Sequence, residues 1–277
     1  MRGLVLVVMV LAAGWPAGHS AAENGPIAYA SGDALRVLDD GRDAPLPNGA
    51  GGSWPAWAPD GTRIAFTSVR RDGLFVMNAD GTGLRRVTRS PTIDIQPTWS
   101  PDGRRLAFAR VVPGRNTDVF VVGVDGRQLR RVTFNRGQDG DPDWAPNGKR
   151  IAWTFAATRR GSRGGIYTMN PDGSAKRYRG AGAAADWSPD GTRFVFSLAG
   201  DLWTSTVRGQ ERTPLAVAPG TDARPRWSPD GTQVAFLSSQ GSATDQYRLW
   251  RVDVTGADRR LLTPDRESVA SLSWAPR

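Results

Sequence analysis

The sequence predicts an all-β protein, a six-bladed β-propeller whose blades are four-stranded antiparallel sheets. A Trp-x-Pro motif recurs six times at intervals of 40–47 residues, and five copies continue with Asp-Gly or Asn-Gly. A period of this length is typical of repeat architectures. Several of the intervening β-type segments are apolar on both faces, which is expected when each sheet is covered by two neighbouring sheets. The motif tryptophans are Trp57, Trp99, Trp144, Trp187, Trp227 and Trp274.

The repeat at residues 54–90 shows how one blade is assembled. Ala58-Pro59-Asp60-Gly61 places proline at the second turn position and glycine at the fourth, as a type I turn favours. A second turn is expected at Asn78-Ala-Asp-Gly81. Around these turns lie four strand-like segments, namely 54–57, 64–68, 74–77 and 84–88. Each repeat therefore reads as a four-stranded meander.

The two ends of the chain complement one another. Residues 27–30 and 34–38 resemble the second and third strands of a blade, with 44–47 as a weak fourth strand. Residues 271–274 resemble a first strand with nothing after it. We therefore expect five continuous blades and one mixed blade, which the C-terminal strand completes and closes.

These motifs resemble TolB-type propeller repeats. The resemblance rests on the Trp-Ser-Pro-Asp-Gly turn, the Ile-Ala-Phe strand, the Asn-Ala-Asp-Gly turn and the Leu-Arg-Arg-Val-Thr strand, and it covers roughly residues 26–277. It implies a propeller that acts as a binding domain. In the periplasmic TolB proteins this domain contacts a peptidoglycan-associated lipoprotein, and similar blades gate prolyl oligopeptidase enzymes. The α/β domain that precedes the TolB propeller and the hydrolase domain of the peptidases have no counterpart in this sequence.

The N-terminal residues indicate export. Residues 1–22 have the layout of a secretory signal peptide, in which Arg2 precedes an apolar run from Gly3 to Gly14 and a small-residue stretch. Residues 23–277 are then expected to form a single propeller domain that is secreted, periplasmic or associated with the cell envelope. After removal of the signal we expect no transmembrane span.

The amino-acid composition limits which catalytic and metal sites the protein can form. The chain has no cysteine and one histidine, His19, which lies inside the predicted signal. The usual catalytic triads and most zinc sites are therefore unavailable to the mature protein. We expect no cofactor and no metal. The formal net charge of +9 favours non-specific attraction to anionic polymers.

Candidate binding residues lie five positions before the motif tryptophans, where the chain enters the innermost strand. Asp94, Asp139 and Asp222 occupy this position in three repeats, and Asp141 follows closely. At the rim of a central channel, such carboxylates serve a ligand or partner, hold a cation, or cap their own loops. The long links between second and third strands emerge on the same face, together with Arg136 and Arg224. Variable loops on a rigid scaffold are the usual place for recognition.

Other repeated residues have structural explanations. We expect the motif tryptophans to pack between blades, and the Pro-Asp-Gly aspartates to shape their turns. Arginine pairs at 85–86, 130–131 and 259–260 fall on outermost strands, where charge protects a sheet edge from aggregation. A ring of such pairs is also suited to anionic polymers.

Together these features favour an exported, non-enzymatic propeller that is expected to be a monomer. It binds an envelope or extracellular protein or peptide through the loop face around its channel. Two alternatives stay open: a carboxylate-based carbohydrate-active enzyme that uses the rim aspartates, and a surface module that binds anionic polymer. No specific nucleic acid is expected as a partner, because no aromatic platform for bases accompanies the arginines.

Overall fold

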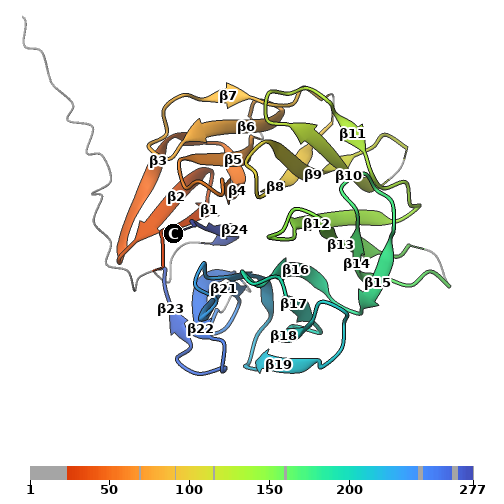
Figure 1. The fold of residues 1–277 in the computed structure, drawn as a ribbon. Coiled ribbons are helices and arrows are strands. Elements are labelled where there is room, and N and C mark those ends of the chain that lie inside the picture. Colours follow the sequence, from red (N-terminus) through yellow and green to blue (C-terminus); the bar gives the residue numbers. More distant parts are fainter. Residues whose placement is uncertain are drawn as a thin grey trace, which may run out of the picture.

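The computed structural model describes residues 24–68, 70–90, 92–114, 116–158, 161–242, 246–263 and 268–276. Six four-stranded sheets are arranged around a central axis (Figure 1). All regular elements in the described ranges are strands. The predicted six-bladed all-β propeller is therefore confirmed. The expected signal segment, residues 1–22, lies outside the described ranges.

The blades are numbered here from the N-terminus, and each is given from its innermost to its outermost strand. Blade 1 contains β24 (Val269–Trp274), β1 (Ile27–Ser31), β2 (Ala34–Asp39) and β3 (Arg42–Ala50). Blade 2 contains β4 (Gly52–Trp57), β5 (Arg63–Ser68), β6 (Gly73–Asn78) and β7 (Arg85–Arg86). Blade 3 contains β8 (Asp94–Trp99), β9 (Arg105–Val111), β10 (Thr117–Gly123) and β11 (Arg130–Arg131).

The remaining blades follow the same order. Blade 4 contains β12 (Gln138–Trp144), β13 (Ile151–Ala156), β14 (Gly165–Met169) and β15 (Arg177–Gly180). Blade 5 contains β16 (Ala183–Trp187), β17 (Arg193–Leu198), β18 (Asp201–Thr206) and β19 (Thr213–Ala216). Blade 6 contains β20 (Asp222–Trp227), β21 (Gln233–Ser238), β22 (Arg248–Asp253) and β23 (Arg260–Leu261).

The C-terminal strand closes the ring. β24 pairs antiparallel with β1 and becomes the innermost strand of blade 1, as the complementary chain ends predict. It also contacts the next blade, because the Ser271 hydroxyl oxygen accepts a hydrogen bond from the Trp54 N–H at 2.9 Å, and that of Ser273 from the Trp57 N–H at 3.1 Å. The two ends of the chain are thus held in one sheet.

The hydrophobic core is divided among the six junctions between blades. Each buried cluster combines residues from two neighbouring blades, and one cluster lies at each junction. At the junction of blades 1 and 2, for example, Leu35 and Val37 pack in one cluster with Trp57, Ile64 and Phe66. This explains why the middle strands are apolar on both faces: each sheet is covered on both sides.

The outermost strands differ from the expectation. β7, β11 and β23 have only two residues each, whereas the sequence pattern favoured longer strands there. An outermost strand pairs on one side only, so a short one leaves fewer backbone groups unpaired at the sheet edge. In blade 1 the weak fourth segment is instead the longest strand, β3, with nine residues.

The outer turns dock successive blades against one another. Gly209, in the turn between β18 and β19, has φ of +83°, and a Cβ there would lie 1.7 Å from the Arg179 carbonyl oxygen of β15. At the equivalent turn of blade 1, Gly41 has φ of +74°, yet a Cβ would meet nothing within 4 Å. Both positions favour glycine because of their left-handed backbone, but only Gly209 lacks room for a side chain.

Deleting residues 270–277 is expected to destabilise the whole propeller. The truncation removes most of β24, including the buried Leu272, and exposes the edge of β1. We expect the melting temperature to fall by roughly 6–12 °C, since roughly 3 kcal/mol is lost and each kcal/mol shifts Tm by about 2–4 °C in a domain of this size. Deleting Arg277 alone is the control. An unchanged melting temperature in calorimetry after the full deletion would contradict the ring closure.

The two turn glycines make a matched pair for a stability measurement. Gly41→Ala is expected to cost about 1 kcal/mol, the penalty for a left-handed backbone. Gly209→Ala is expected to cost roughly 3 kcal/mol, because overpacking against β15 adds about 1–3 kcal/mol. Urea denaturation of both variants provides the free energies of unfolding. Equal losses would show that the turn of blade 5 does not press on blade 4.

Candidate functional site: the central channel

A cavity of about 420 Å³ follows the propeller axis. Its walls come from the innermost strands, which run from the end of the propeller with the long links (the loop end) to the end with the Pro-Asp-Gly turns (the turn end) (Figure 1). In five of the six blades the residue three positions before the motif tryptophan contributes to a loop-side layer, made of Trp54, Gln96, Asp141, Arg224 and Ser271. The residue one position before it contributes to a turn-side layer, made of Ala56, Thr98, Asp143, Asp186, Arg226 and Ser273.

A repeated backbone irregularity shapes the loop-side layer. In blades 2 to 6 the residue three positions before the tryptophan is not glycine, yet it has φ between 46° and 56°. The register with the second strand shifts at the same place in each of these blades, as in a β-bulge. A bulge re-aims a side chain and bends the strand. Left-handed backbone at non-glycine residues costs of order 1–3 kcal/mol each, and such outliers often mark functional sites.

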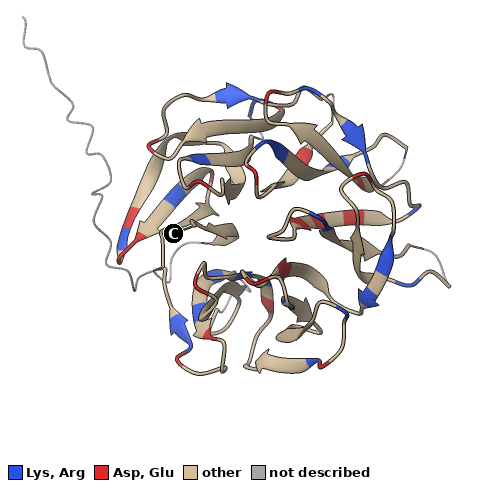
Figure 2. Ribbon diagram, viewed as in Figure 1, with Lys and Arg blue, Asp and Glu red and all other residues tan. Residues whose placement is uncertain are grey.

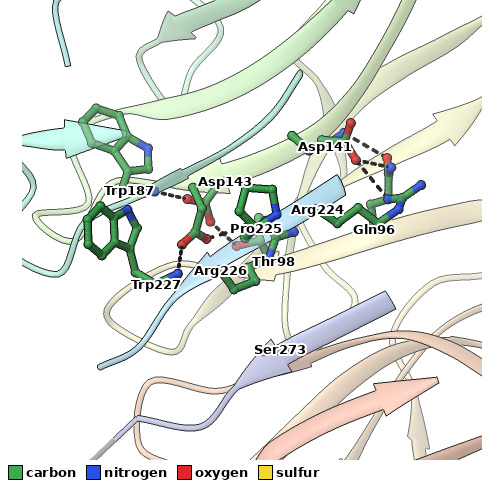
Figure 3. Close-up of polar contacts among 12 residues, drawn as sticks. Gln96, Thr98, Asp141, Asp143, Trp187, Arg224, Pro225, Arg226, Trp227 and Ser273 are labelled. Carbon is green, nitrogen blue, oxygen red and sulfur yellow. Dashed lines mark hydrogen bonds and ion pairs between the residues drawn. The ribbon is translucent and has the colours of Figure 1, made fainter. Parts of the chain in front are cut away.

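Side chains of the loop-side layer join across the channel (Figure 3). The Gln96 amide nitrogen donates to the Asp141 carboxylate, and the Gln96 amide oxygen accepts from the Asp141 N–H at 2.9 Å. Arg224 reaches the same carboxylate, with 3.4 Å between its Nη1 and Oδ1, and its guanidinium lies 4.0 Å from the centre of the Trp54 ring. Blades 2, 3, 4 and 6 are thereby linked at this level. Burial lowers the pKa of Arg224, and Asp141 opposes that shift.

The turn-side layer connects blades 1 and 2, blades 4 and 5, and blades 5 and 6. The Asp143 carboxylate accepts a hydrogen bond from the Trp187 N–H at 3.0 Å, and the Asp186 carboxylate accepts one from the Trp227 N–H at 2.8 Å (Figure 3). The Ser273 hydroxyl oxygen accepts a hydrogen bond from the Trp57 N–H in the same way. A side-chain acceptor one position before the tryptophan is therefore a repeated link between neighbouring innermost strands.

Asp143 and Asp186 form a buried acidic pair at the channel wall. Desolvation, with the charge of Asp143 close by, raises the pKa of Asp186 to about 8. Desolvation also raises the pKa of Asp143, and Arg226 opposes the shift. The distance from Arg226 Nη1 to Asp186 Oδ1 is 3.7 Å. The negative charge of Asp143 thus favours the protonated form of Asp186.

The structure separates the sequence-predicted residues into two groups. Asp141 and Arg224 line the cavity and contact each other. Asp94, Asp139 and Asp222 lie at the loop end as expected, but they are buried inside their own blades and are not part of the cavity wall. The side chain of Arg136 is exposed at the loop end, outside the cavity.

The three buried aspartates have partners within their blades. Asp94 binds the Arg110 guanidinium at 2.5 and 2.7 Å, and Asp222 binds that of Arg259 at 2.8 and 2.9 Å. Asp139 accepts hydrogen bonds from the Asn135 amide at 2.9 Å and from the Trp153 indole N–H at 2.7 Å. Burial raises the pKa of Asp139, and these hydrogen bonds oppose the shift. The partners are side chains and not backbone N–H groups, so the loop-capping alternative and the ligand-binding alternative both stay predictions.

The motif tryptophans lie between the hydrophobic core and the channel. Trp57, Trp99, Trp144 and Trp187 are buried within clusters that span two blades, and all six tryptophans border the turn end of the channel. The turn aspartates have hydrogen-bond partners within their own turns; Asp60, for example, accepts a hydrogen bond from the Thr62 N–H at 2.9 Å.

Across the described ranges, no group of three or more His, Cys, Asp and Glu is arranged to hold a metal ion. Nor do those ranges contain a helix long and apolar enough to cross a membrane.

Sequence reasoning missed Asp143, Asp186, Gln96, Thr98 and Arg226. Their position relative to the tryptophan was the available signal, because the residue one before it lines the channel in all six repeats and the residue three before it does so in five. The bulge was not visible in the sequence, so the wall positions were not separated from those facing neighbouring blades.

The pair makes stability depend on pH. The pKa of Asp186 is about 8 in the folded state, against an ordinary aspartate value of 3.8, so the folded state retains a proton that the unfolded state loses. The free energy of unfolding is therefore expected to decrease as pH rises from about 4 to 8. Asp186→Asn keeps an acceptor for the Trp227 N–H and removes the titration, so its melting temperature should vary less over this range.

Asp190→Asn is the matched control for this measurement. The Ser188 hydroxyl and the Thr192 N–H lower the pKa of Asp190, so its contribution to stability is present near neutral pH and is lost in acid. The control should leave the decrease between about pH 5 and 8 intact when melting is followed by circular dichroism. Parallel curves for wild type and Asp186→Asn would contradict the shifted titration.

Parts of the chain are similar in sequence to known proteins. The family model described as TolB beta propeller domain matches residues 46–177. The Tol-Pal system protein TolB of Anaeromyxobacter dehalogenans (strain 2CP-C) is 49% identical over 43 residues, which is 15% of this chain and 10% of that protein. The match thus spans only a small part of that relative's length.

Solved structures share the fold. TolB from Acinetobacter baumannii superposes with a TM-score of 0.78 at 21% identity, over 91% of this chain and 67% of that chain. Oligogalacturonate lyase from Vibrio parahaemolyticus superposes with a TM-score of 0.61 at 12% identity, over 85% of this chain and 74% of that one. Identities this low show the architecture alone. Taken with the family match, they confirm the resemblance drawn from the motifs: residues 46–177 match the TolB β-propeller domain, and the chain shares the propeller architecture of solved TolB structures.

Proposed function

We propose that this protein is an exported, non-enzymatic propeller that binds a segment of a protein or peptide partner at its central channel. The supporting observation is that some positions of the repeat keep the same residue in every blade, whereas the positions that line the loop side of the channel do not. The tryptophan and the turn after it recur from blade to blade, whereas the loop-side layer carries Trp, Gln, Asp, Arg and Ser. Packing between blades demands repeated residues, but a recognition surface needs different ones at fixed places.

The character of the cavity fits a peptide segment better than a bulk polymer. Its wall combines apolar surface from the motif tryptophans and prolines with a few polar groups, among them Asp141, Arg224 and Arg226. Binding sites are usually concave, largely apolar and supplied with a small number of placed polar groups. The TolB relatives, whose name places them in a Tol-Pal protein system, agree with a protein partner.

We assign the partner's contact to the turn end of the channel. The cavity extends from the loop-side layer to the prolines of the Pro-Asp-Gly turns, including Pro59, Pro101 and Pro146. At the other end the contacts among Trp54, Gln96, Asp141 and Arg224 narrow the passage. Entry from the turn end therefore reaches both layers, while the long links at the loop end are the alternative contact surface.

A structural role explains why Asp143 and Asp186 lie at the channel wall, without catalysis. Asp143 and Asp186 each hold the backbone of the next blade, and Ser273 has the same role at the same repeat position. A serine in an equivalent place points to a structural link rather than to an acid–base pair. The lyase that shares the fold supports no assignment of its activity here, because the likeness extends to the architecture only.

A charge reversal in the channel tests the proposal. Tagged wild-type protein and Arg224→Glu are used as baits for proteins of the source organism's cell-envelope fraction. Arg224→Glu places a carboxylate beside Asp141 and Trp54 without changing a blade core, so we expect loss of the captured partner. Quantitative mass spectrometry of the eluates measures the loss.

Arg136→Glu is the matched control, because it makes the same charge change on an exposed side chain at the loop end. The control is expected to capture the partner as wild type does. Loss with Arg136→Glu alone would move the contact to the loop end, and full capture by both variants would overturn the channel as the binding site. Both variants are first compared with wild type by thermal melting.

A further inference from the structure

Four arginines meet on the outer rim where blade 4 contacts blade 5. Arg177 and Arg179 lie two residues apart on the outermost strand β15, Arg150 directly precedes β13, and Arg208 lies in the turn between β18 and β19. The close approach of Gly209 to the Arg179 carbonyl oxygen brings that turn against β15. Arg150 reaches the residues before β15, where its Nη1 donates to the Ala175 carbonyl oxygen at 3.4 Å. We call these four residues the β15 basic patch.

The four arginines of the patch have no acidic partner, whereas some other arginines of the outer rim do. Within the described residues, no carboxylate lies at ion-pair distance from any of its four guanidinium groups. By contrast, Arg131 of β11 pairs with Asp118 at 2.6 Å, and Arg259 beside β23 pairs with Asp222 at 2.8 Å. Figure 2 shows basic residues on β7, β11, β15 and β23 around the rim.

The positive charges of the patch affect the protonation of Arg179. Burial lowers the pKa of Arg179, and the positive charges of Arg177, Arg150 and Arg208 lower it further. Arg177 and Arg208 are exposed, so their charges face the solvent next to a partly buried one. Like charges held this close raise the free energy of the folded state, and a bound anion would relieve the repulsion.

We propose that the β15 basic patch is a binding site for a linear phosphate polymer, held through its phosphate groups. Guanidinium groups offer paired N–H donors that match phosphate oxygens. The patch crosses the junction of two blades on the convex rim, and a flexible chain follows such a surface. The site lies away from the channel and is independent of the function proposed for it.

Two other classes of partner fit the patch less well. A stable protein interface has an apolar centre, and the exposed large apolar side chains of the described residues, Ile93, Val111, Leu129, Phe134, Val217 and Val254, all lie outside it. Recognition of nucleic-acid bases needs aromatic rings for stacking. The Tyr178 ring beside the patch is covered by the Arg163 guanidinium at 3.8 Å.

The test compares two double variants of the full chain. Arg177→Gln/Arg208→Gln removes two exposed charges from the patch, and Arg85→Gln/Arg86→Gln removes two exposed charges from β7 in blade 2. Binding of long-chain inorganic polyphosphate is measured by isothermal titration calorimetry at several salt concentrations. We expect the patch variant to bind about tenfold more weakly at low salt, with a slope of log K against log salt that is smaller by about 1–2.

The β7 variant is expected to bind within about twofold of wild type, because the charges it loses do not contact the polymer. Equal weakening by both variants would overturn the proposal and show that net charge alone attracts the polymer. Binding to phosphatidylglycerol vesicles without binding to polyphosphate would also overturn it, in favour of a membrane surface. Thermal melting separates these outcomes from misfolding, and Arg177→Gln alone replaces the double variant if the latter melts early.

Discussion

No blade of this propeller can bury its own two faces, and the rest of the structure depends on that constraint. The apolar clusters lie between sheets, so each blade is stable only with a neighbour on both sides. A linear array would leave two faces exposed to water, whereas a closed ring leaves none. Closure requires the first and last segments of the chain to share a sheet, which the pairing of β24 with β1 accomplishes.

Ring closure also creates the channel. Six innermost strands converge on the axis, and the bulge before each motif tryptophan turns side chains toward it. The side chains of Asp143, Asp186 and Ser273 accept hydrogen bonds from the backbone N–H groups of the next innermost strand, and these bonds tie the wall together. The same residues that hold neighbouring blades in register thus determine the charge inside the channel, and the burial that makes the links strong also raises the pKa of Asp186.

Local patterns predicted the blades well because the signals for turns and strands act over short distances. The Pro-Asp-Gly turns and the apolar segments at 64–68 and 74–77 correspond to the connection after β4 and to β5 and β6. The carboxylates at the loop end show the limit of such patterns. The partner of Asp222 is Arg259, 37 residues away in the chain, and no local rule pairs them. Asp143 and Asp186 were missed for the same reason, since they come from different blades.

By itself the sequence determined the number of blades, their strand order and the sharing of one sheet by the chain ends, because turn chemistry and apolar patterning operate within each repeat. Only the tertiary structure decided which charges are neutralised, which line the channel and which stay uncompensated on the rim. Those outcomes depend on distances between blades, and such distances exist only once the ring has closed. Arg177 of β15 and Arg131 of β11 look alike in sequence, but only Arg131 has an acidic neighbour, Asp118.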